Sequence, residues 1–82
     1  MFRKTTLPTN IMEESREIIA YNMIGYRKEH NLSREEFAEI CDMSSRHIEN
    51  IELGKFAITV DTLDKISYGT NLATTYWLTD HR

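Results

Sequence analysis

The segment that decides the fold is residues 32–55, which read LSREEFAEICDMSSRHIENIELGK. Ser33 is followed three residues later by Glu36, the capping-box pattern that satisfies free backbone amides at the start of a helix. Ser44 is a second cap of the same residue type, and Gly54 is a stop signal. The segment therefore predicts two short helices, over residues 34–41 and 45–53, joined by a tight turn.

Apolar residues in this segment are spaced so that the two helices can pack against each other. The first predicted helix buries four residues: Phe37, Ala38, Ile40 and Cys41. On the second, Ile48 and Ile51 share one face and fill the space between the helices, while Asp42 in the turn tolerates the left-handed conformation. Two helices crossing steeply at such a turn form a helix-turn-helix unit. This packing leaves four residues exposed on the second helix: Ser45, Arg46, Glu49 and Asn50.

Upstream of this unit, apolar residues recur at mostly helical spacing between Asn10 and Asn31. Asn10 and Glu13 form another capping-box pattern, and asparagine at position 31 can adopt the left-handed conformation that ends a helix. We expect this helix to begin between Asn10 and Ser15 and to end near His30 and Asn31. Residues 1–9 lack periodicity and are expected to form a flexible arm, with the domain spanning residues 10–82.

Downstream, Thr59 can cap a helix that ends around Tyr68 and Gly69. Its predicted inward positions are Val60, Leu63 and Ile66. Leu72 and the run Tyr76-Trp77-Leu78 indicate a short final helix. Because strand-like alternation is nowhere sustained, we expect an all-α fold of five short helices.

The composition limits the size of the protein and the kinds of partner it takes. A chain of 82 residues has room for one domain with a modest core. Its single cysteine cannot form an internal disulfide, and no segment has the length of a membrane span or the apolar core of a signal peptide, so we expect a cytoplasmic protein. The net charge of −3 argues against nucleic acid, whose binding depends on Lys and Arg.

Residues of the types used in catalysis and metal binding are present but not suitably arranged. Cys41 and the three histidines, His30, His47 and His81, lack the spacing of metal ligands. We find no arrangement of Ser, His and Asp, or of paired carboxylates, that predicts catalysis. We therefore expect no enzyme activity, no metal and no cofactor.

Residues 32–55 resemble the helix-turn-helix segment of the lambda-repressor-like family, also called the Xre/Cro type. The family's segment runs Leu-Ser-Gln-Glu-Glu-Leu-Ala and continues into a recognition helix that ends in Glu-x-Gly-Lys. Arg27 stands where the family places an arginine, and Tyr76-Trp77-Leu78 look like its closing helix. The resemblance covers residues 18–80 and implies a sequence-specific transcriptional regulator. It further implies a repressor that binds double-stranded DNA as a homodimer at an operator with two half-sites.

The resemblance also implies roles for individual residues. The implied DNA contacts are Arg34, Ser45, Arg46, His47, Glu49, Asn50 and Lys55. Arg27 and Glu52 would form an ion pair that sets the angle of the recognition helix more than it stabilises the fold. The implied dimer interface is Tyr76, Trp77 and Leu78, for which ordinary core packing remains the alternative.

Acidic residues favour a second hypothesis. Glu49, on the presumed DNA face, either accepts a hydrogen bond from cytosine N4 or repels phosphate. The same fold could instead serve as a protein-interaction module, such as an antitoxin or adaptor, whose acidic faces meet a basic protein partner. Duplex binding across a salt series distinguishes the two, because binding to DNA weakens as salt rises.

Overall fold

The computed structural model of the protein describes residues 11–55 and 58–82. Within them lie five helices and no strand, which confirms the expected all-α class. The helices are α1 (Ile11–Glu29), α2 (Arg34–Ile40), α3 (Ser45–Glu52), α4 (Val60–Thr70) and α5 (Thr74–Leu78). The predicted arm at residues 1–9 and the predicted cap at Asn10 lie outside the described residues.

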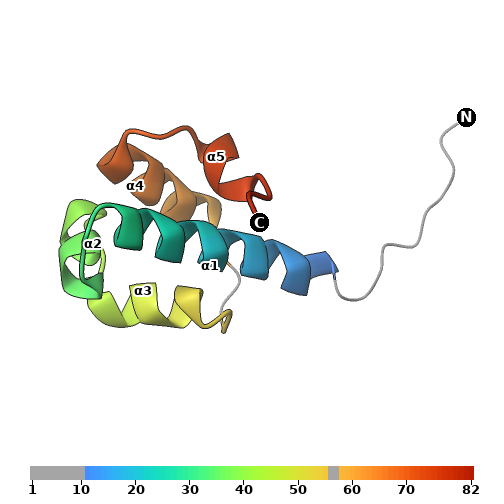
Figure 1. The fold of residues 1–82 in the computed structure, drawn as a ribbon, viewed down its shortest axis with the longest axis horizontal. Coiled ribbons are helices and arrows are strands. Elements are labelled where there is room, and N and C mark those ends of the chain that lie inside the picture. The colour runs from blue at the N-terminus through green and yellow to red at the C-terminus, as the bar shows by residue number, and fades with distance from the viewer. Residues whose placement is uncertain (1–10, 56–57) are drawn as a thin grey trace, which may run out of the picture.

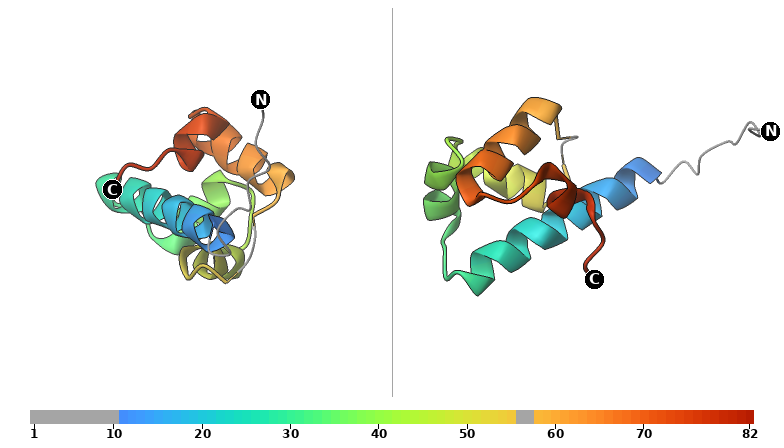
Figure 2. Two further views of the ribbon diagram at one scale, coloured as in Figure 1. Left: turned by 90° about the vertical axis from the view of Figure 1, so that its right-hand side faces the viewer. Right: turned by 90° about the horizontal axis from the view of Figure 1, so that it is seen from above.

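The long helix α1 forms the middle of the molecule (Figure 1). It contacts α3 on one side and α5 on the other, and α2 packs against both α3 and α4. Figure 2 shows the same arrangement from two further directions, with α4 and α5 lying together. No helix within the described ranges is long and apolar enough to span a membrane. Because α1 lies between them, α3 forms one outer edge of the bundle, on the side opposite α4 and α5 (Figure 1).

The helix starts follow the predicted caps. The Ser33 hydroxyl accepts from the Glu36 amide at 3.0 Å while the Glu36 carboxylate accepts from the Ser33 amide at 2.8 Å, so the capping box is confirmed. The hydroxyls of Ser44 and Thr59 accept amide hydrogen bonds at the starts of α3 and α4. Each of these short helices therefore begins at a residue whose side chain replaces a missing backbone partner.

The helix ends depend on residues that tolerate a left-handed backbone. Positive φ angles occur at Asn31 (56°), Asp42 (57°), Gly54 (71°) and Asn71 (60°). After α2, the Asp42 amide donates to the Glu39 carbonyl and the next amide donates to the Ala38 carbonyl, which is a Schellman motif. Asparagine and aspartate occupy the three positions that glycine does not, because they reach this conformation with modest strain. The predicted turn at Asp42 is confirmed.

Each helix contributes one large, fully buried side chain to a single core. These are Met23, Phe37, Ile48, Ile66 and Trp77, from α1 to α5 in order. Full burial of a side chain of this size contributes about 1.5–3 kcal/mol relative to exposure. The core thus holds α3 to the rest of the bundle through Ile48 and Ile51.

Two residues predicted to face the core are exposed. Val60 lies on the same stripe of α4 as Asp64 and Tyr68, and all three side chains face solvent. Ile40 is the last residue of α2 and lies at the edge where α2 meets Gly69 of α4, so the core covers only part of it. The prediction was wrong at both positions because the side of each helix that faces the core is too narrow to include all of the apolar residues assigned to it.

Candidate nucleic-acid interface

The recognition helix predicted from the sequence, α3, packs against the core on one side and faces solvent on the other. Ile48 and Ile51 are buried against α1 and α2, so the opposite side of the helix faces solvent. Arg46 and Glu49 are exposed on that side, and Asn50 is half-buried. The anchoring by two isoleucines leaves polar side chains of α3 available to a ligand.

Four residues at the start of α3 line one shallow hollow of about 330 Å³: Ser44, Arg46, His47 and Asn50. Ser44 lines the hollow while its hydroxyl caps the helix by accepting from the His47 amide. Ser45 is half-buried beside the hollow, and Glu49 lies on the exposed face outside it. The structure thus brings most of the predicted contact residues of α3 onto one face.

At the other end of α3, Lys55 follows the left-handed Gly54 and is exposed. Its amide donates to the Asn50 carbonyl at 3.0 Å, and the Gly54 amide donates to the Ile51 carbonyl at 2.9 Å. This Schellman motif fixes the backbone that leads out of the helix. The backbone of Lys55 is therefore fixed just beyond α3, and its exposed side chain extends from there into solvent.

Arg27 and Glu52 form a bidentate ion pair between α1 and α3. The Arg27 Nε lies 2.7 Å from Glu52 Oε2, and its Nη2 lies 3.0 Å from Oε1. Arg27 Nη1 also donates to the Leu32 carbonyl at 3.1 Å. The pair thereby connects the end of the recognition helix to α1 and to the residue just before the α2 cap.

Arg34 joins the same carboxylate. Its Nε donates to Glu52 Oε1 at 2.9 Å, a contact that the sequence did not predict. The hydrogen bond to Glu52 and the charge of Glu52 raise the pKa of the Arg34 guanidinium above its usual value, with smaller contributions from Glu49 and Glu35. The residue expected to contact DNA is thus already held by one hydrogen bond inside the protein.

The three residues of α5 predicted to form a dimer interface differ in their exposure to solvent. Trp77 is fully buried and packs edge-on against Tyr26 and Tyr76, so it belongs to the core and cannot form an interface. Leu78 is 51% exposed, and Tyr76 is half-buried. The prediction was wrong for Trp77 because a helix of five residues turns only one of these neighbouring side chains inward.

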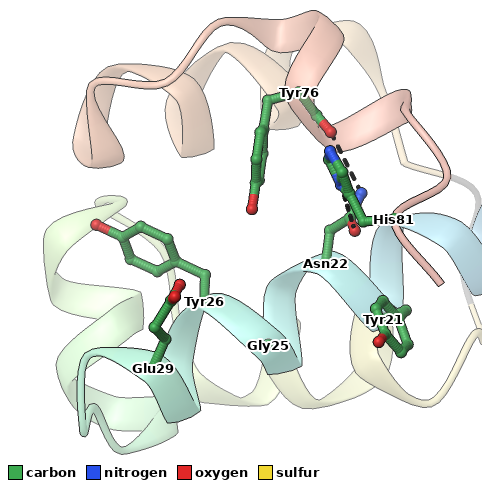
Figure 3. A pocket seen from close by; sticks show the side chains of 7 residues that line it. All are labelled: Tyr21, Asn22, Gly25, Tyr26, Glu29, Tyr76 and His81. Carbon is green, nitrogen blue, oxygen red and sulfur yellow. Dashed lines mark hydrogen bonds between the residues drawn. The ribbon is translucent and has the colours of Figure 1, made fainter.

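Asn22, which the sequence pattern did not single out, holds α5 against α1. The buried Asn22 amide donates to the carbonyls of Trp77 and Thr79, each at 2.9 Å, and its oxygen lies 3.1 Å from His81 Nδ1. Figure 3 shows Asn22 with its bonds to His81 and to the Tyr76 carbonyl, beside an open pocket of about 380 Å³. The only sequence signal was an asparagine at helical spacing between the inward Ile19 and Tyr26.

Residues 25–77 match the sequence model of the helix-turn-helix family. The match covers more than half of the chain, so this protein belongs to that family, in its lambda-repressor-like branch. The chain is 28% identical over 75 residues to a protein named "Neisseria hypothetical transcription factor", from Neisseria meningitidis serogroup B (strain ATCC BAA-335 / MC58). That alignment covers 89% of this chain and 71% of the relative.

A solved structure is similar over almost the whole chain. The crystal structure of hypothetical transcription factor NHTF from Neisseria superposes with a TM-score of 0.78 at 26% sequence identity. The superposition covers 95% of this chain and 90% of that one. The family and fold expected from residues 32–55 are therefore confirmed.

Proposed function

We propose that this protein is a sequence-specific transcriptional regulator that places α3 in the major groove of DNA. The observation that carries the proposal is the hollow at the start of α3, where Arg46 and Asn50 lie together on the exposed face. Arginine can bond guanine O6 and N7, and asparagine can bond adenine N6 and N7. The similarity to a relative and to a solved structure that both carry the name of a Neisseria hypothetical transcription factor supports the same function.

The remaining contacts follow from the chemistry of each side chain. Ser45 and His47 would contact bases or flanking phosphates, and Glu49 would accept from cytosine N4. Lys55 would bind a phosphate beyond the end of α3, where a charge positions the protein without reading sequence.

We further propose that the protein acts as a repressor in the cytoplasm, bound as a homodimer to an operator with two half-sites. Two-fold symmetry would place the half-sites about 34 Å apart, one turn of the duplex. An unpaired and buried cysteine fits a reducing compartment. Occupancy of promoter DNA would suffice for repression, without any chemical step.

Selection of bound sequences from a random duplex pool tests the proposal. Arg46→Ala should weaken binding to the selected duplex by about 1–3 kcal/mol and relax the preference at one base position. Lys55→Ala should weaken binding to all duplexes alike and lower the salt slope by about 1. Lys65→Ala, which removes an exposed lysine on α4 whose ammonium makes only a long hydrogen bond of 3.4 Å to the Asp42 carbonyl, is the matched control. If both test variants bound every duplex as the parent does, the assigned face would be wrong.

A protein-interaction module is the second candidate, and Glu49 is the observation that favours it. An exposed carboxylate on α3, on a chain with net charge −3, repels phosphate and suits a basic protein. A parent protein that binds no duplex at any salt concentration, but binds a basic partner tightly, would decide for this function.

A further inference from the structure

Glu52 accepts hydrogen bonds from two arginines although the charge of one would balance its own. Its side chain is 1% exposed, at the last residue of α3. Arg27 already supplies a bidentate pair and uses its remaining Nη1 on the Leu32 carbonyl. Arg34 therefore brings a second positive charge to a carboxylate that is already compensated, and the three residues together carry a charge of about +1.

The guanidinium of Arg34 is held by one edge only. Its Nε donates to Glu52 Oε1, its side chain is 40% exposed, and no described residue accepts a hydrogen bond from its Nη1 or Nη2. The guanidinium is planar and rigid, so fixing the Nε bond also fixes the directions of the two Nη groups. The buried carboxylate thus orients a pair of donors that the protein itself leaves unused.

We propose that Glu52 is a positioning residue that holds Arg34 so that its two Nη groups bind one phosphate of the DNA backbone. The inference rests on the proposed function and names a contact made by α2, outside the hollow on α3. A phosphate matches the forked geometry of arginine and is attracted by the net charge of about +1 on the three residues, which the nearby Glu49 and Glu35 offset only in part. Arg27 takes part only indirectly, by fixing Glu52.

The glutamine that is usual in the family at position 34 lacks both the charge and the Nε donor. The arrangement is therefore a property of this chain's own arginine. Lysine would keep the charge but not the geometry, since an ammonium group cannot hold Glu52 by one edge and present a planar fork to a phosphate. Arg34→Lys consequently separates positioning from charge.

The test measures binding to the duplex selected from the random pool and to an unrelated duplex. Arg34→Lys is expected to weaken both about 10-fold with the salt slope unchanged, and Arg34→Gln to weaken both at least as much while lowering the slope by about 0.9. Arg46→Lys, the matched control, should change the preference between the two duplexes instead. Parental affinity in Arg34→Lys would overturn the inference.

Neutral methylphosphonate linkages, placed one at a time along the selected duplex, locate the contact. One linkage in each half-site should weaken the parent about 10-fold and leave Arg34→Gln almost unaffected. The inference is overturned if no linkage has an effect that depends on Arg34. A parent that binds no duplex overturns the proposed function and this inference with it, so the two failures are distinguishable.

For Glu52→Gln, loss of positioning and simple electrostatics predict changes in DNA affinity of opposite sign. Removal of a negative charge near DNA would tighten binding, whereas loss of positioning would weaken it. Because Glu52→Gln also disturbs the pair with Arg27, positioning of Arg34 is measured by the extra weakening seen with Arg34 present compared with Arg34→Gln. Because Glu52→Gln leaves the half-buried Arg27 with a neutral partner, the folded fraction of this variant is checked by circular dichroism. If it does not fold, the Arg34→Lys and methylphosphonate measurements still decide.

Discussion

The thiol of Cys41 is buried in the core at the end of α2, beside residues that offer it no charge. Burial raises its pKa to about 11, because the thiolate would lose the solvation it has in water. A thiolate is the form that attacks disulfides and binds metals. The side chain is therefore a small apolar core residue, despite belonging to a reactive type.

Cys41 should react slowly with a disulfide reagent while the protein is folded. At about pH 8 its thiolate fraction is about 100-fold below that of an exposed cysteine, and burial restricts access further. Unfolding in concentrated guanidinium should restore the ordinary rate. Equal rates for the folded and unfolded protein would show that the thiol is accessible.

The same shift predicts a loss of stability in alkali. The pKa of Cys41 is higher in the folded than in the unfolded protein, so the neutral thiol contributes to the free energy of unfolding. That contribution is complete below the pKa of the unfolded protein and is lost as pH rises towards about 11. Cys41→Ala should lack this component of the decline. The comparison is made by urea unfolding of both proteins across that range, and parallel curves would contradict it.

At the scale of helices, α4 approaches the backbone of α2 closely at Gly69. A Cβ added at Gly69 would lie 2.9 Å from the Ile40 carbonyl carbon and closer still to its oxygen. Both atoms belong to the backbone, so neither can move without shifting α2. Gly25 in α1 offers the opposite case, because a Cβ there would meet nothing within 4 Å.

The two glycines give a matched pair of substitutions. Gly69→Ala should destabilise the protein by about 1–3 kcal/mol, since the clash exceeds the gain in helix propensity. Gly25→Ala should stabilise it by about 0.5–1 kcal/mol, because only the propensity and the entropy of the unfolded chain change. Urea unfolding measures both, and shifts in the same direction would contradict the packing of α4 on α2.

These elements also show what the sequence can predict. The caps at Ser33 and Ser44 and the turn at Asp42 depend on bonds within a few residues, so a local pattern is enough to place them. Asn22 bonds carbonyls 55 and 57 residues away, and no local pattern contains that information. Arg34 similarly meets Glu52 only because α2 and α3 fold together.

At the scale of the whole molecule, a net charge of −3 makes non-specific attraction to DNA weak. Helix α3 carries one arginine and two glutamates, and the charge of one glutamate, Glu52, is neutralised by its ion pair with Arg27. A single copy therefore has few charges with which to bind a duplex. Two linked copies on two half-sites would double the contacts, while the dimer loses its translational and rotational freedom only once on binding.

In the homodimer that we propose, we expect the second copy to contact the exposed Leu78 on α5. Leu78→Lys should give a monomer that binds the selected duplex at least 10-fold more weakly, since each copy then binds alone. Its own stability should change little, because Leu78 is 51% exposed. Tyr68→Lys makes a similar change on α4, at a residue 93% exposed, and should leave the dimer intact. Light scattering after size-exclusion chromatography measures the mass of each, and a Leu78→Lys dimer as stable as the parent's would place the interface elsewhere.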